Sequence, residues 1–161
     1  AGRLAASIPR SVGQIPCHYS RRASHGYTDL SQSPLYAFGY GLSYTTFEYS
    51  DLKITKSNKK DVYQQVSFKV RNSGTRDGEE VVQLYINDVK SSVETPAKLL
   101  KAFKRIPIRA GETIEVEFEL GFEELSLYNA LLEQTVDPGE FKVMIGAASN
   151  DIRLEGSFTI E

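Results

Sequence analysis

The segment 113–120 constrains the fold most, because apolar and acidic residues alternate along it without a break. Every second position is apolar, at Ile114, Val116, Phe118 and Leu120, and glutamates stand between them. Successive side chains of a β-strand point to opposite faces, so a period of two predicts a strand with one buried and one wet face. We therefore expect β-sheet in this region.

Six further segments have β-type patterns: Phe47–Thr55, Val62–Asn72, Glu80–Asp88, Leu99–Ile108, Glu140–Gly146 and Ile152–Ile160. Turn signals separate them, as at Asp137-Pro-Gly, where Pro fixes φ and Gly tolerates a positive φ. Glu123–Leu132 is the one stretch for which a helical turn is expected. Seven short strands of this kind predict an all-β fold, an antiparallel β-sandwich of the immunoglobulin or fibronectin type III kind.

Residues 1–46 differ from the rest of the chain. They are rich in Gly, Pro, Ser, Arg and Tyr and show no sustained period. Long irregular segments are unusual inside a compact domain. We therefore divide the chain into an irregular N-terminal arm, 1–46, and a sandwich, 47–161, and expect the arm to be mobile or to lie on another surface. Because the chain opens at Ala1 without Met or a signal peptide, we expect it to be mid-protein sequence.

Composition narrows the classes of partner. The chain has 161 residues with a net charge of −2 and 40% hydrophobic residues, enough for a buried core without disulfides. Its single cysteine, Cys17, cannot form an internal bridge. Both charge signs are spread along the chain, so no nucleic acid is expected as a partner. No apolar run approaches the roughly 20 residues of a spanning helix, so we predict no membrane span.

No constellation of catalytic or metal-binding residues is apparent. The histidines His18 and His25 have no ligand cluster at zinc spacing, and Gly39–Gly41 lacks the third glycine of a phosphate loop. We predict no metal and no cofactor. The acidic pairs are interpreted as solvated charges at loops rather than as a glycosidase pair. These pairs are Glu79/Glu80, Glu123/Glu124 and Asp137/Glu140, and neighbours on a strand such as the first pair would point to opposite faces.

The end of the arm is unusually aromatic. The stretch from Pro34 to Phe47 carries five aromatic residues in fourteen positions, with glycines between several of them. Aromatic rings anchor one protein surface on another and also stack on sugars, and glycine lets the backbone approach closely. We predict that four of them anchor domain docking or line the rim of a cleft, with direct sugar contact as the alternative: Tyr36, Phe38, Tyr40 and Tyr44.

Several motifs resemble one enzyme family. Ile8-Pro-Arg-Ser-Val-Gly-Gln-Ile-Pro16 and the aromatic stretch 34–47 are similar to the end of the second domain, and the stretch after it, in family-three glycoside hydrolases of the β-glucosidase and β-xylosidase type. Glu80-Val-Val-Gln-Leu-Tyr-Ile86, Pro96-Ala-Lys-Leu-Leu-Lys-Ala-Phe103 and Pro138-Gly-Glu-Phe-Lys-Val-Met-Ile-Gly146 resemble their fibronectin type III-like C-terminal domain, in the same order.

The resemblance implies an accessory role. In such enzymes the catalytic Asp and Glu lie in upstream domains, so no catalytic residue is expected here. We expect a C-terminal fragment that braces the catalytic domains of a retaining β-glycosidase acting on terminal β-linked glucose or related sugars. Its expected partners are these upstream domains, a second copy in a homodimer, and the parent's β-glucoside or oligosaccharide substrate. The resemblance also implies a periplasmic or extracellular parent.

Two alternatives remain open at this point. One is a carbohydrate-binding module, which the Tyr and Phe content favours and the lack of Trp disfavours. The other is a stand-alone structural domain of the immunoglobulin type, because a fold does not determine a function.

Overall fold

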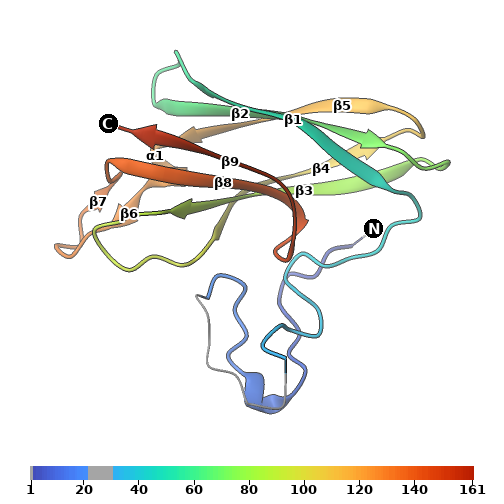
Figure 1. Cartoon of the computed structure of the whole chain (residues 1–161), viewed down its shortest axis with the longest axis horizontal. Coiled ribbons are helices and arrows are strands. Elements are labelled where there is room, and N and C mark those ends of the chain that lie inside the picture. The colour runs from blue at the N-terminus through green and yellow to red at the C-terminus, as the bar shows by residue number, and fades with distance from the viewer. Residues whose placement is uncertain (1, 22–30) are drawn as a thin grey trace.

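A computed structural model describes residues 2–21 and 31–161, so His25 lies outside the described residues. Two β-sheets pack face to face, and the arm extends from one end of the sandwich and runs beneath it in the view of Figure 1. The strands of the sandwich are β1 (Phe47–Lys56), β2 (Val62–Asn72), β3 (Gly78–Asp88), β4 (Leu99–Ile108), β5 (Thr113–Gly121), β8 (Gly139–Ala148) and β9 (Asp151–Ile160). A short 3-10 helix, η1 (Val12–Gln14), lies in the arm.

All strand pairs in the two sheets are antiparallel. One sheet has the order β1-β2-β5 and the other β4-β3-β8-β9. The seven predicted strands are thus confirmed, and their ends agree to within two residues. The all-β, fibronectin type III-like fold class is confirmed as well.

The core lies between the sheets and follows the period of two. On β5 the side chains of Val116, Phe118 and Leu120 are buried, whereas the glutamates between them are exposed. Phe68 on β2 stacks on Phe118 with ring centroids 6.1 Å apart. The largest fully buried side chains of the core also include Leu84, Ile108, Phe141, Ile145 and the valines of β2, β3 and β8. Burial of these side chains is the main favourable contribution to folding.

The stretch Glu123–Leu132, for which a helical turn is expected, is helical only at its start. Only Phe122–Leu125 is helical, as α1, and the chain then forms a small hairpin of β6 (Leu127–Tyr128) and β7 (Gln134–Thr135). Five residues connect these two strands, and among them Leu132 has a φ of 61°. A left-handed backbone costs a non-glycine residue roughly 1–2 kcal/mol. The rest of the stretch forms a β-hairpin rather than a continuation of the helix.

None of the helices in the described part of the chain is long and apolar enough to cross a bilayer.

Candidate functional site

The arm forms a short antiparallel ladder with itself. The amide of Ile8 donates to the carbonyl of Tyr36 over 2.8 Å, and the amide of Leu35 donates back to the carbonyl of Ile8 over 2.8 Å. Nearer the start of the arm, the amide of Leu4 donates to the carbonyl of Tyr40 over 2.9 Å. These bonds hold the first and last parts of the arm side by side.

Aromatic stacking fastens this ladder to the outer face of the β4-β3-β8-β9 sheet. The rings of Tyr19 and Phe38 stack at 4.5 Å, and Tyr19 also meets the buried ring of Tyr85 edge-on at 5.9 Å. The Tyr19 hydroxyl accepts the amide of Leu100 on β4 over 3.1 Å. The carbonyl of Phe38 accepts the amide of Ser149, in the β8–β9 turn, over 2.9 Å. The part of the arm that the structure describes therefore lies on its own sandwich.

A glycine allows the closest approach. Gly39 is buried with a φ of 83°, and a Cβ there would lie 2.6 Å from the side-chain amide of Gln83 and 3.0 Å from the Cα of Ala148. Gln83 in turn donates to the carbonyl of Ala147 over 2.8 Å and accepts the hydroxyl of Tyr85. A residue with a side chain would be both strained and displaced at this position.

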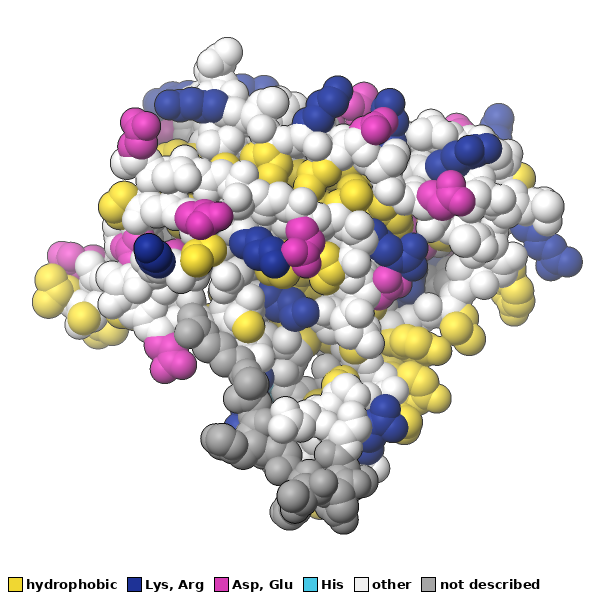
Figure 2. Space-filling model, viewed as in Figure 1, with side chains coloured by type: hydrophobic (Ala, Val, Ile, Leu, Met, Phe, Trp, Pro, Cys, Tyr) yellow, Lys and Arg dark blue, Asp and Glu magenta, His cyan; other side chains and the backbone are white. Residues whose placement is uncertain are grey.

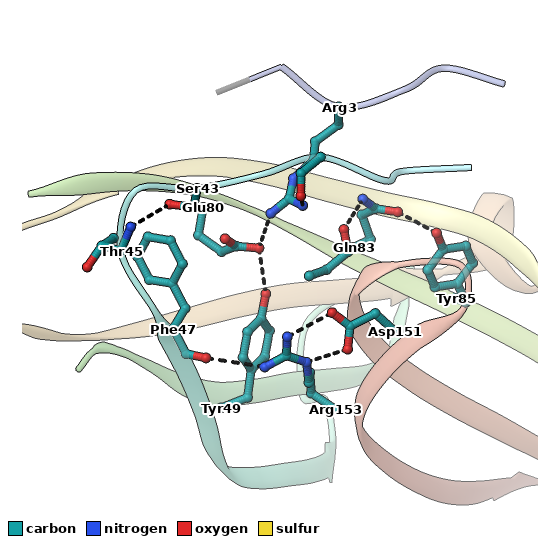
Figure 3. Close-up of polar contacts among 12 residues, drawn as sticks. Arg3, Ser43, Thr45, Phe47, Tyr49, Glu80, Gln83, Tyr85, Asp151 and Arg153 are labelled. Carbon is teal, nitrogen blue, oxygen red and sulfur yellow. Dashed lines mark hydrogen bonds and ion pairs between the residues drawn. The ribbon is translucent and has the colours of Figure 1, made fainter. Parts of the chain in front are cut away.

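An ion pair reaches from the arm into the end of the core. Arg3 donates to the Oε1 atom of Glu80 over 2.7 Å, and another of its nitrogens donates to the carbonyl of Gly41 over 3.0 Å. The hydroxyl of Tyr49 donates to the same Glu80 oxygen over 3.1 Å. Figure 3 shows Arg3 descending from the arm onto Glu80 while Tyr49 approaches from the opposite side. The arm thus supplies the cation for a carboxylate on β3.

Burial sets the electrostatics of this cluster. Desolvation raises the pKa of Glu80, and the charge of Arg3 and the bond from Tyr49 partly oppose that shift. Desolvation also raises the pKa of the Tyr49 hydroxyl far above its ordinary value, with a further contribution from Glu80. The Tyr49 hydroxyl therefore keeps its proton and acts as a hydrogen-bond donor.

A second cation closes the other side of Tyr49. Arg153 lies over the Tyr49 ring at 5.6 Å from its centroid and donates to the carbonyl of Phe47 over 3.2 Å. It also pairs with Asp151 through two bonds, one of 2.5 Å and one of 2.7 Å. The bonds from Arg153 lower the pKa of the Asp151 carboxyl. Figure 3 shows Arg153 beside the Tyr49 ring, with Asp151 next to it.

The expectation that Glu79 and Glu80 are both solvated is wrong for Glu80. The two residues point to opposite faces of β3, as adjacent strand residues must. The Glu79 side chain is 43% exposed and bonds Arg105, whereas the Glu80 side chain is 2% exposed. A buried carboxylate is tolerated because Arg3 and Tyr49 satisfy it. Its position inside an apolar run was the sequence signal for this role, but nothing pointed to Arg3 as the partner.

A buried asparagine fastens the end of the arm. The hydroxyl of Thr45 donates to Oδ1 of Asn72 over 2.5 Å, and Asn72 donates to the carbonyls of Arg76 and Ile108 over 2.8 Å and 3.0 Å. Asn72 is fully buried with its side-chain atoms bonded. These bonds fix the position of the chain just before β1 begins.

The four predicted anchors occupy different environments. Phe38 is half-buried on the sandwich, and its neighbour Ala37 is 3% exposed. The rings of Tyr36 and Tyr40 lie 4.9 Å apart and line an open depression on the arm. Tyr44 is 92% exposed. The structure thus brings Tyr36 and Tyr40 together, turns Phe38 inward and leaves Tyr44 in solvent.

This arrangement favours holding surfaces together over acid–base chemistry. Glu80 cannot reach a substrate because it is buried and already bonded to Arg3 and Tyr49. Glu124 caps α1 by accepting the amide of Gly121, and Asp137 accepts the amide of Ser92. Among residues 2–21 and 31–161, no three His, Cys, Asp or Glu side chains are placed to hold a metal ion.

Comparison with known proteins places this architecture. Residues 80–149 match the family model described as a fibronectin type III-like domain. A putative β-xylosidase of Formosa agariphila is 44% identical over 157 residues, covering 95% of this chain and 21% of the relative. A periplasmic β-glucosidase of Salmonella typhimurium is 38% identical over 174 residues, covering 99% of this chain and 23% of the relative. The chain therefore spans about a fifth of the length of these relatives.

Solved structures agree with the sequence matches. A β-glucosidase involved in saponin metabolism, from intestinal bacteria, superposes with a TM-score of 0.90 at 37% identity over 99% of this chain and 22% of its own. The β-glucosidase of Listeria innocua in complex with glucose gives a TM-score of 0.89 at 34% identity, with 98% and 24% covered. The match extends through the arm as well as the sandwich. The chain therefore belongs to the family-three glycoside hydrolases of the β-glucosidase and β-xylosidase type, as the C-terminal part that carries their fibronectin type III-like domain.

Proposed function

We propose that this chain is the non-catalytic accessory domain of a retaining β-glycosidase whose substrate is a terminal β-linked glucose or a related sugar. The names of the relatives, β-glucosidases and β-xylosidases, support this substrate class. The chain accounts for about a fifth of such proteins, and its buried carboxylate is committed to an ion pair. Catalysis is therefore assigned to the remaining four-fifths of the parent.

The proposed role is to brace the upstream catalytic domains through the arm. One side of the arm is fastened to the sandwich by the bond from Ser149 to Phe38 and by the close packing of Gly39 on Gln83, while its other side presents large apolar side chains to solvent. Tyr44 is 92% exposed and Leu42 is 74% exposed. Figure 2 shows hydrophobic side chains gathered where the arm meets the sandwich. This two-sided arm is the observation that carries the proposal, because exposed apolar patches mark interaction surfaces.

Two measurements test this function together. The isolated chain should not hydrolyse an aryl β-glucoside, whereas the parent protein should. In the parent, Tyr44→Ser should lower the melting temperature, because the ring would leave a packed interface; in the isolated chain it should change little. Turnover by the isolated chain would contradict the accessory role. An equal effect of Tyr44→Ser on both proteins would contradict docking through the arm.

Carbohydrate binding is a second candidate. The paired rings of Tyr36 and Tyr40 line an open depression together with Arg3, Leu4 and Ile8. Ring pairs of this kind can stack on the C–H faces of a sugar. Titration of the chain with oligosaccharides, followed by amide chemical shifts of this depression, separates the candidates, since a purely bracing domain should give no saturable shift.

Location and self-association complete the proposal. One relative is named as a periplasmic enzyme, which supports a periplasmic or extracellular parent. A homodimer is proposed as a further partner state, and sedimentation of the parent protein at several concentrations tests it.

A further inference from the structure

The β6–β7 hairpin displays three large apolar side chains, called here the leucine tip: Tyr128, Leu131 and Leu132. Their exposed fractions are 64%, 77% and 82%. Figure 2 shows hydrophobic side chains projecting at the edge of the molecule where Figure 1 places this hairpin. Single exposed apolar residues are ordinary on protein surfaces, but a cluster on one projecting turn is characteristic of an interaction surface.

The leucine tip is held by a hydrogen-bonded turn. The side chain of Asn129 accepts the amides of Leu131 and Glu133 over 2.9 Å and 3.0 Å, and its backbone exchanges bonds of 3.0 Å with Leu132 and Glu133. The Asn129 amide group also donates to the Glu133 carboxylate over 3.2 Å. The turn therefore presents its leucines in one conformation, and docking would not require ordering it.

The backbone at the tip favours a different residue from the one present. Leu132 has a φ of 61°, a conformation that glycine or asparagine adopts far more readily than leucine. Its side chain is 82% exposed and contributes little to the core of this chain. A strained position that carries an exposed leucine indicates a use for that side chain outside the described structure.

The charge around the tip indicates what covers it. Between Leu125 and Lys142 every charged residue is acidic: Glu133, Asp137 and Glu140. A loop of the sandwich also links the segment after β7 to the arm, because Asp137 accepts the amide of Ser92 over 2.7 Å and Ala97 in the same loop donates its amide to the carbonyl of Ser20 over 3.0 Å.

We propose that the leucine tip is a second docking point for the upstream catalytic part of the same parent protein, where it enters an apolar pocket bordered by Lys or Arg side chains. The inference rests on the proposed function. The four-fifths of the parent outside this chain supply the covering surface, and the acidic side chains near the tip select a basic border.

Hydroxyl-radical footprinting of the leucine side chains tests this directly. Oxidation of Leu131 and Leu132 is compared between the isolated chain and the parent protein, with Tyr44 of the arm measured in the same samples. We expect both leucines to be oxidised about tenfold more slowly in the parent, because the core of an interface excludes water.

The outcomes separate the two proposals. Protection of Tyr44 and of both leucines supports both of them. Protection of Tyr44 alone overturns the tip while leaving arm docking in place. Equal oxidation of all three residues in both proteins overturns arm docking and the tip together. Protection of the leucines in the isolated chain that grows with concentration overturns the proposal in favour of a second copy as the occupant.

The melting temperature of a double variant tests the same proposal independently. Leu131→Ser with Leu132→Gly should lower the melting temperature of the parent by about 2 °C or more, but not that of the isolated chain, where the glycine relieves the positive φ. Tyr63→Ser is the matched control, because Tyr63 is a partly exposed ring on β2 in the β1-β2-β5 sheet, outside the β6–β7 hairpin. It should shift both proteins alike. If the double variant lowered the melting temperatures of the parent and of the isolated chain equally, docking by the tip would be contradicted.

Discussion

At the scale of single residues, the arm contacts the core of the sandwich through Arg3 and Glu80, which lie 77 residues apart in the chain. Glu80 shares the inward face of β3 with Val82, at the end of the apolar core. A carboxylate in that place requires a cation, and the cation comes from the arm. The position of the arm and the charge state of the core are thereby coupled.

Arg3→Met should destabilise the fold by about 3 kcal/mol, the range measured when one partner of a buried ion pair is removed. The loss arises because the Glu80 carboxylate is left buried without its cation. Urea unfolding followed by circular dichroism measures the free energy of unfolding. The double variant Arg3→Met with Glu80→Gln should recover most of the loss, because the amide needs no counter-charge. If the double variant were as unstable as Arg3→Met, packing rather than charge would explain the effect.

The same pair gives a pH dependence of known sign. Burial raises the folded-state pKa of Glu80 above its ordinary 4.5. The stability from its protonated form is therefore complete below pH 4.5 and is lost as the pH rises through the folded-state pKa. Without Arg3 that pKa should rise further, so Arg3→Met should cost more stability at about pH 7 than at about pH 4. Unfolding free energies of both proteins at the two pH values check this, and an equal loss at both would contradict it.

At the scale of elements, two glycines of the β8–β9 ladder differ in what surrounds them. A Cβ on Gly146 would lie 2.3 Å from the carbonyl oxygen of Asp151, which is backbone, whereas a Cβ on Gly156 would meet the flexible side chain of Ile54 at 2.8 Å. Gly146→Ala should cost roughly 3 kcal/mol and Gly156→Ala roughly 1 kcal/mol, since only a side chain can move aside easily. The melting temperatures of the two variants measure which is less stable. If Gly156→Ala were the less stable one, the backbone of the β8–β9 turn would move aside more easily than the side chains of β1.

In the β6–β7 turn, by contrast, a substitution is expected to stabilise the chain. Leu132→Gly should stabilise the isolated chain by about 1 kcal/mol, because glycine adopts the positive φ without penalty. Leu131→Gly is the control: no positive φ is found there, so the added freedom of the unfolded chain should cost roughly 0.5–1 kcal/mol. Denaturant unfolding of both variants measures the difference. Equal destabilisation would mean that the Leu132 side chain packs more than its exposure indicates.

The elements also show which parts of the fold could be predicted from the sequence. Strands such as β5 were predictable, because alternation is a local signal that sandwich packing then reinforces. The β6–β7 hairpin was not, since its strands have two residues each and its turn places a leucine at positive φ, where no turn rule expects one. The burial of Glu80 was missed because its partner lies in an irregular segment that has no pattern to read.

At the scale of the whole molecule, the described arm behaves as a third layer over part of the β4-β3-β8-β9 sheet. Tyr19 and Phe38 cover Tyr85 on its outer face, and a backbone bond from Ser149 to Phe38 joins the arm to the β8–β9 turn. Sheet faces in a sandwich are usually buried on one side and wet on the other, so a buried outward tyrosine needs such a cover. The arm was expected to be mobile or to lie on another surface, and in the structure this part of it packs against its own domain.

Phe38→Ala tests whether this layer is separable from the sandwich. Removing the ring leaves Tyr19 without its stacking partner, so the arm should open more often while the core strands keep their contacts. The amide of Gly39 bonds Leu4 within the arm, and the amide of Ser149 bonds Phe38 across the contact with the sandwich. Hydrogen exchange at both amides should become about tenfold faster or more, whereas central amides of β2 and β8 should be unchanged. A uniform acceleration in all of these amides would show instead that the arm and sandwich open only together. In that case the aromatic cover would be an integral part of the core, and truncating the arm would unfold the domain.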